Sequence, residues 1–378
     1  MADVVWYFGV GNDCTEDFIH MIGQLLTERY LIIERLGSGG FSETYLARDK
    51  YLPCNPLCVV KQFQLSPSST ISLEMARQLF ETEARVLDQL GQNHAQIPTL
   101  FAYCHEQDQL YQIQEYIEGE NLGDEIAQGK CLTSEAAIDL LNQTLPILEY
   151  IHSHQVIHRD IKPSHFIQRD GVIVLIDFGA AYCVPITGKP TEVIFSIGTP
   201  GYMPEEQEAG APEPSSDLYA LGASVIHLLT GVHPKELERN PVTGELDWRM
   251  HLQGRVINPG LSTVLDRMVQ RNPRMRYQNA SEALAALGAA LRAPAPAKRR
   301  SFKRGRWVPA RQLWKPAVLS LLLGGWYFYF SNQIEGAGAM LTQLEHAVSQ
   351  SDNDVALVHE ASTQSDVNRM MVAPDNRF

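Results

Sequence analysis

The sequence predicts an α+β fold of two lobes, a small β-rich lobe followed by a larger helical lobe. Residues 30–117 contain short runs of apolar, aromatic and β-branched residues, which are typical of strands. From about residue 121 onward, apolar residues recur at three- and four-residue steps, as on the buried face of a helix. Hydrophobic residues make up 44% of the 378 residues, which is enough for a sizeable core. We therefore expect one folded domain over residues 29–293, with its first lobe at 29–117 and its second at 121–293.

The first lobe is expected to contain several strands and one helix. The strands are Tyr30 to Leu36, Thr44 to Ala47 and Leu57 to Phe63. Ala76 to Leu90 is rich in helix formers and predicts a helix between the strands of this lobe.

The second lobe is expected to be built from helices. One helix is marked by Ile138, Leu141, Leu145 and Leu148, which share one face, and Thr133 is a suitable cap at its start. Later helices are expected over residues 217–230, 261–270 and 281–291.

Four further segments are expected outside this domain. Residues 1–28 form an N-terminal extension, to which the sequence gives no chemistry. Residues 294–315 form a linker that begins with alternating Pro and Ala and continues with Lys and Arg. An apolar run follows at 316–331, and a polar tail of unassigned role occupies 332–378.

Charge and cysteine content narrow the functional classes. The net charge of -13 argues against nucleic-acid binding, because phosphate contacts need concentrated Lys and Arg. The 6 cysteines show no paired spacing, so we expect reduced thiols rather than a metal or disulfide site. The first residues lack a basic stretch before an apolar one, so no signal peptide is expected.

The apolar run at 316–331 predicts attachment to a membrane. A helix from Ala317 to Phe330 would span about 21 Å, short of the roughly 30 Å of a hydrocarbon core. Leu313 and Trp314 would extend it if Lys315 reached back to the interface. The preceding Lys and Arg residues would face the cytoplasm. We expect a single-pass membrane protein with a cytoplasmic domain; the alternative is a cytoplasmic protein in which the run is a buried or interfacial helix.

A glycine-rich stretch between two expected strands points to phosphate binding. Glycines at 37, 39 and 40 let the backbone approach phosphates and adopt conformations that are costly for other residues. The stretch resembles the glycine-rich loop of protein kinases, with Ser42 in place of the third glycine and Thr44 in place of the valine. The resemblance implies ATP contacts from Leu36, Gly37, Ser38, Gly39, Gly40, Phe41, Ser42 and Thr44.

The resemblance continues through the first lobe. Lys61, in the third expected strand, matches the lysine that neutralises the α- and β-phosphates of ATP. Its partner by alignment is Glu83, and Glu81 is the fallback. The backbone groups of Glu115 and Ile117 match those that hydrogen-bond adenine.

The segment His158 to His165 resembles the catalytic loop of protein kinases. In the family, the aspartate at position 160 accepts the proton of the substrate hydroxyl, and the lysine at 162 accompanies serine and threonine substrates. The resemblance therefore assigns catalysis to Asp160 and Lys162. Because the motifs cover residues 29–293 in the right order, we expect the bilobal protein kinase fold.

The metal site departs from the family pattern. Asp177, in Asp-Phe-Gly, would bind the Mg²⁺ that bridges the phosphates. His165 stands where the family has a metal-binding asparagine, and imidazole is poorly suited to magnesium. Three outcomes stay open: one metal on Asp177 suffices, His165 favours Mn²⁺, or catalysis is lost.

The segment Gly198 to Glu206 resembles the peptide-positioning loop of the family. Thr199 is expected to hydrogen-bond near Asp160, and Glu206 to pair with Arg276. Asp217 matches the buried aspartate that braces the catalytic loop.

The activation loop would run from residue 180 to 197. Its candidate phosphosites are Thr187, Thr191 and Ser196, for which Arg159 would supply a cation.

The resemblance implies a serine/threonine protein kinase of the bacterial, cyanobacterial-like branch of the eukaryotic-like (Hanks-type) family. Its expected partners are ATP with Mg²⁺ or Mn²⁺, proteins that present Ser or Thr hydroxyls, and the membrane; a homodimer is left open. We expect it to autophosphorylate and to act in signalling. The main alternative is a pseudokinase, a nucleotide-binding scaffold, because of His165. A small-molecule kinase of related fold is a third reading.

Overall fold

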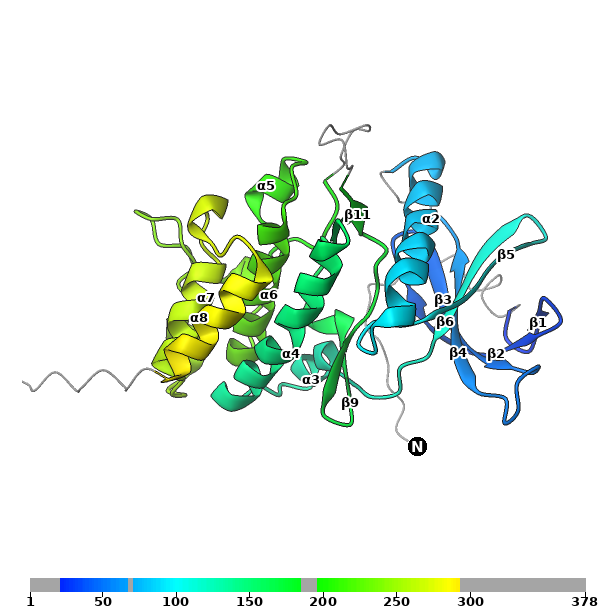
Figure 1. Ribbon diagram of the computed structural model, residues 1–378, viewed down its shortest axis with the longest axis horizontal. Coiled ribbons are helices and arrows are strands. Elements are labelled where there is room, and N and C mark those ends of the chain that lie inside the picture. Colours follow the sequence, from blue (N-terminus) through cyan, green and yellow to red (C-terminus); the bar gives the residue numbers. More distant parts are fainter. Residues whose placement is uncertain (1–20, 67–70, 185–195, 293–378) are drawn as a thin grey trace, which may run out of the picture. The chain divides into compact units, whose positions relative to one another are not determined.

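A computed structural model describes residues 21–66, 71–184 and 196–292 of the chain (Figure 1). Several sequence predictions lie outside these residues: the linker at 294–315, the apolar run at 316–331, the tail at 332–378, and the candidate phosphosites Thr187 and Thr191. Within the described ranges, no helix is both long enough and apolar enough to cross a membrane.

The first lobe is a six-stranded antiparallel sheet with the strand order β1-β2-β3-β4-β6-β5. Its strands are β1 (Leu25–Leu26), β2 (Tyr30–Ser38), β3 (Ser42–Asp49), β4 (Leu57–Phe63), β5 (Leu100–Glu106) and β6 (Gln109–Glu115). The three strands expected from the sequence are present, with β2 and β3 extending further toward the glycine-rich turn between them.

The strand β1 belongs to the segment that the sequence assigned to the N-terminal extension. Leu26 is buried in the core of the sheet beside Tyr30 and Ile32. The amide of Thr27, just after β1, donates to the Glu106 carboxylate at the end of β5, 2.8 Å away. The sheet is therefore curled so that its two edge strands approach each other at this end, and the folded unit begins before residue 29.

One long helix, α2 (Leu73–Leu90), lies against this sheet (Figure 1). It begins three residues before the expected start at Ala76, because the side chain of Ser72 accepts a hydrogen bond from the Met75 amide and caps the helix. Its buried face carries Phe80, Glu83 and Leu87. A charged residue on the buried face needs a partner of opposite charge, and the partner of Glu83 is Lys61 on β4.

The second lobe is helical, as expected. Its helices are α3 (Leu122–Ala127), α4 (Ser134–Ser153), α5 (Glu205–Glu208), α6 (Pro214–Thr230), α7 (Pro259–Met268) and α8 (Ala280–Arg292). The Thr133 side chain accepts from the Ala136 amide, so the expected cap of α4 is confirmed. The helix α6 is buried along almost its whole length and packs against α4 and α7. Figure 1 shows α4, α6, α7 and α8 packed together.

Short elements position the loops of the site. They are β7 (Glu120–Asn121), β8 (Val156–Ile157), β9 (Phe166–Arg169), β10 (Val172–Leu175) and β11 (Tyr182–Cys183), with the 3-10 turns η1 (Gly91–Asn93), η2 (Pro163–His165), η3 (Pro234–Glu236), η4 (Arg249–Leu252) and η5 (Pro273–Met275). The hairpin of β9 and β10 holds Lys162 and Asp177 near each other. Lys162 precedes η2 and β9, and Asp177 follows β10. Elements of two to four residues carry almost no periodicity, so sequence patterns give little indication of them.

Candidate active site

The side chain of Lys61 on β4 joins two carboxylates. Its Nζ lies 2.5 Å from Glu83 Oε1 on α2 and 3.2 Å from Asp177 Oδ1 after β10. Burial alone would lower the pKa of Lys61, but the charges of Asp177 and Glu83 outweigh it and raise that pKa above its ordinary value. Lys61 is therefore a fixed cation, and it links the sheet, the helix α2 and the second lobe.

The partner of Lys61 is Glu83, and the fallback Glu81 is exposed to solvent. The carboxylate of Glu83 also accepts from the backbone amide of Phe178. Residues two positions apart on a helix point to nearly opposite sides, so only one of the two glutamates can face the sheet.

The glycine-rich turn joins β2 to β3. The amide of Gly39 donates to the carbonyl of Ser42, 2.7 Å away, which closes the turn. A Cβ added at Gly37 or Gly40 would meet nothing within 4 Å. None of the three glycines adopts a left-handed backbone conformation, so that part of the sequence interpretation is wrong. The open space around the backbone fits the other part, a close approach by phosphates.

Two glutamines on β6 form a buried polar pair near the expected adenine site. The Nε2 atom of Gln112 donates to Oε1 of Gln114 over 2.8 Å. Gln112 is fully buried beside Lys61 in the sheet, and its own Oε1 has no partner in the described residues. The sequence analysis did not single out Gln112. At the end of β6, the Glu115 amide donates to the Thr99 carbonyl.

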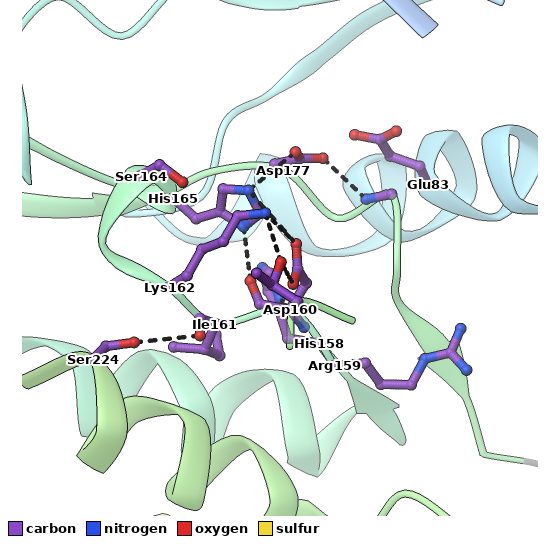
Figure 2. Close-up of polar contacts among 12 residues, drawn as sticks. Glu83, His158, Arg159, Asp160, Ile161, Lys162, Ser164, His165, Asp177 and Ser224 are labelled. Atoms are coloured by element: carbon purple, nitrogen blue, oxygen red, sulfur yellow. Dashed lines mark hydrogen bonds and ion pairs between the residues drawn. The ribbon is translucent and has the colours of Figure 1, made fainter. Parts of the chain in front are cut away.

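The Asp160 carboxylate accepts hydrogen bonds from two side chains, one of them Lys162 of the same loop (Figure 2). Asp160 Oδ1 accepts from the Thr199 hydroxyl at 2.6 Å, and Asp160 Oδ2 accepts from Lys162 Nζ at 2.8 Å. Lys162 also donates to the Thr199 oxygen at 2.9 Å. Burial would raise the pKa of Asp160, but the neighbouring groups, His165 and Lys162 foremost, outweigh it and lower that pKa. Asp160 is therefore ionised, and its carboxylate oxygens can accept hydrogen bonds.

Asp217 on α6 holds the backbone of the catalytic loop by hydrogen bonds. Its two carboxylate oxygens accept the amides of His158 and Arg159, each at 2.9 Å. Arg159 has a φ of 66°, a left-handed conformation that is strained for a residue with a side chain. The two bonds hold the strained backbone in place. His152 on α4 also bonds Asp217, at 2.8 Å, and the sequence did not single it out.

His165 lies between the two acidic residues of the site (Figure 2). Its Nδ1 is 2.7 Å from the backbone carbonyl oxygen of Asp160, and its Nε2 is 3.3 Å from Asp177 Oδ2. Burial lowers the pKa of His165 to about 4. The charge of Lys61 helps to keep Asp177 ionised, with its pKa well below the ordinary value although burial opposes this.

His165 and Asp177 lie close enough together to share one metal ion. In the part of the chain that the structure describes, no group of three or more His, Cys, Asp or Glu side chains is placed to hold a metal by itself. Mg²⁺ at phosphate sites is commonly held by one or two carboxylates plus phosphate oxygens and water. Asp177 and His165 therefore fit a cation that the phosphates of a nucleotide complete.

Arg159 points away from the catalytic carboxylate (Figure 2). Its Nε donates to the Ala180 carbonyl at 2.5 Å, and its guanidinium lies over the Tyr182 ring. Burial lowers the pKa of Arg159 to about 10. Ser196, the one candidate phosphosite that the structure describes, is exposed.

The peptide-positioning loop is anchored by two contacts. Arg276, fully buried, binds both carboxylate oxygens of Glu206 at 2.5 and 3.0 Å. Gln207 Nε2 donates to the carbonyls of Arg159 and Ile197 at 2.6 and 2.7 Å, which ties this loop to the catalytic loop. The sequence predicted the first contact and missed the second. Glutamine carries no motif signal, so only the packing reveals its role.

Comparison with known proteins agrees with this geometry. Residues 30–304 match the family model described as "Protein kinase domain". The chain is 46% identical over 271 residues to serine/threonine-protein kinase PknA of a Nostoc species, covering 70% of this chain and 48% of that protein. It is 43% identical over 265 residues to serine/threonine-protein kinase C of a Synechocystis species, covering 68% and 49%.

A more distant relative is serine/threonine-protein kinase PknB of Mycolicibacterium smegmatis, 29% identical over 277 residues, covering 68% of this chain and 42% of that protein. The chain spans about half the length of the curated relatives it matches.

Proposed function

The chain belongs to the protein kinase family, and we propose that it is a serine/threonine kinase that transfers the γ-phosphate of ATP to protein hydroxyls. The observation that carries the proposal is the convergence of Lys162 and Thr199 on the Asp160 carboxylate. The names of the relatives support the same substrate class, and the resemblance to cyanobacterial kinases stated from the motifs is shown by the identities.

The residues of this chain have separate parts in that reaction. The substrate hydroxyl oxygen attacks the γ-phosphorus, the bond from the γ-phosphorus to the bridging oxygen breaks, and ADP leaves. Asp160 orients the hydroxyl and accepts its proton. Lys162 offsets the charge on the transferred group, while Lys61 offsets that of the remaining phosphates. A divalent cation held by Asp177 and His165 would supply further charge neutralisation.

A transfer assay with the full chain tests the proposal. The chain is incubated with γ-labelled ATP, Mg²⁺ or Mn²⁺, and a generic basic protein. We expect label to reach Ser and Thr, and Asp160→Asn to abolish transfer. Asp170→Asn, an exposed acid in the turn between β9 and β10, is the matched control and should keep full activity. Wild-type transfer that never exceeds the Asp160→Asn blank would contradict the proposal.

A pseudokinase is the second candidate, and His165 is the observation that favours it. An imidazole in place of an amide removes an oxygen ligand that Mg²⁺ prefers. In this case the wild type binds ATP without transferring phosphate, and His165→Asn creates activity. The same assay therefore separates the two candidates.

Autophosphorylation is a further part of the proposal. Arg159 is a buried cation whose guanidinium, within the described ranges, contacts the Ala180 carbonyl and the Tyr182 ring, and a phosphate could supply its counter-charge. Ser196, Thr187 and Thr191 are the proposed acceptors. Mapping the label after self-reaction should find at least one of them, and the triple replacement by Ala should remove that label.

We also propose that the full protein is attached to a membrane through residues 316–331. The support is the sequence alone: a basic cluster directly precedes an apolar run that ends in aromatic residues. Flotation of the full chain with lipid vesicles should succeed, and Leu321→Arg with Leu322→Arg should prevent it. If the wild type stays in the aqueous fraction as the double variant does, the result favours the alternative of a cytoplasmic protein. The homodimer stays a prediction.

A further inference from the structure

The backbone around His165 determines which of its ring nitrogens carries a proton. Nδ1 is 2.7 Å from the carbonyl oxygen of Asp160. A carbonyl oxygen can only accept a hydrogen bond, so Nδ1 must be the donor. In the neutral ring, Nε2 is then the nitrogen with a free lone pair.

That lone pair faces a carboxylate. Nε2 lies 3.3 Å from Asp177 Oδ2 and 3.8 Å from Asp160 Oδ2. Two acceptors at this separation repel each other unless positive charge lies between them or on the ring. A cation bound between Nε2 and Oδ2 would remove this repulsion, because both atoms would then be its ligands.

The charges of the surrounding residues point the same way. The described side chains joined around Lys61 and Lys162 include three carboxylates, those of Glu83, Asp160 and Asp177, but only these two ammonium groups. These five side chains together carry one uncompensated negative charge. An additional cation at the His165–Asp177 contact would offset it.

We propose that His165 Nε2 and Asp177 Oδ2 together bind a first-row transition ion, and that this site prefers Mn²⁺ to Mg²⁺. The proposal deepens the proposed kinase function and rests on it, because the phosphates of a bound nucleotide must supply the remaining ligands. Imidazole nitrogen favours transition ions over Mg²⁺, which prefers oxygen.

The spacing of the two atoms fits such an ion. Two ligands about 2.1 Å from one ion, at the right angle of octahedral geometry, lie about 3.0 Å apart. The observed 3.3 Å between Nε2 and Oδ2 needs only a small adjustment. The Asp160 carbonyl also fixes the orientation and the tautomer of the His165 ring through its contact with Nδ1.

The test uses electron paramagnetic resonance of Mn²⁺ bound to the full chain with a non-hydrolysable ATP analogue. Spin-echo modulation should show a directly bound histidine nitrogen. Labelling all histidines with ¹⁵N should change that modulation, so the wild type alone can report the ligand. His165→Asn should bind Mn²⁺ without the nitrogen signal. His105→Asn, an exposed histidine on β5, should keep it.

Selectivity is measured in the same samples by displacing Mn²⁺ with Mg²⁺. We expect the wild type to require at least about tenfold more Mg²⁺ than His165→Asn. Bound Mn²⁺ without a nitrogen signal, an equal Mg²⁺ requirement, or no Mn²⁺ binding when the nucleotide is bound would each overturn the inference. Phosphate transfer in any of these cases leaves the proposed kinase function intact, whereas failure to bind ATP at all contradicts that function.

Discussion

The ammonium group of Lys61 on β4 lies 2.5 Å from the carboxylate of Glu83 on α2, and both groups are buried. This ion pair fixes the helix relative to the sheet and leaves Lys61 in reach of Asp177. The arrangement therefore makes the position of α2 a condition for activity.

Replacing Glu83 by Gln tests this relationship. We expect kcat/KM to fall by about 100-fold, because Lys61 loses the charge that positions it and small displacements of catalytic groups are costly. Glu81→Gln, an exposed residue on the same helix, should leave kcat/KM unchanged. An equal loss in both variants would show that helix stability, rather than the ion pair, is responsible.

Asp217→Asn should destabilise the protein. The amide group of Asn can accept only through its oxygen, so one of the two backbone amides, of His158 or Arg159, loses its partner. We expect the free energy of unfolding to fall by about 3 kcal/mol. Urea denaturation measures the change. Asp88→Asn, at an exposed position of α2, should stay within about 0.5 kcal/mol of the wild type.

Two arginines near the peptide-positioning loop give a matched comparison. Arg276 is buried and binds Glu206 through two nitrogens, whereas Arg271 pairs with Glu205 at the surface. Arg276→Lys should lower the free energy of unfolding by about 3 kcal/mol, since Lys cannot make the bidentate contact with Glu206. Arg271→Lys should leave the stability close to that of the wild type, because the pair of Arg271 with Glu205 is exposed to solvent. Similar losses in thermal unfolding would contradict the assigned difference.

His227 on α6 should make stability depend on pH. The hydroxyl of Tyr202 lies 2.6 Å from His227 Nδ1, and burial lowers the pKa of His227 from 6.5 to about 4. Between pH 6.5 and about 4 the unfolded chain therefore binds a proton that the folded chain does not, so stability falls as the pH is lowered through this range.

Thermal unfolding at pH 7 and pH 5 measures this effect. The drop in Tm between the two values should be smaller in His227→Gln than in the wild type. His105→Gln, at an exposed position, should retain the wild-type drop. An unchanged drop in His227→Gln would rule out His227 as its source.

Much of the fold was predictable because the main strands and helices have their own periodicity. Thr133 caps α4 as the sequence indicated, and the strand at Leu57–Phe63 has the expected bounds. The edge strand β1 was not predictable, because two residues carry no pattern and Leu26 is buried only through its contacts with the curled sheet.

The sequence by itself determined the family and the chemical groups of the site, because Asp160, Lys162 and Asp177 stand in contiguous motifs. The tertiary structure decided which groups meet. It placed Glu83, which the sequence had named before Glu81, against Lys61, added His152 and Gln207 as supports, and placed His165 Nε2 against Asp177. Such contacts join distant segments of the chain, so they depend on packing and charge in three dimensions, which local sequence patterns do not encode.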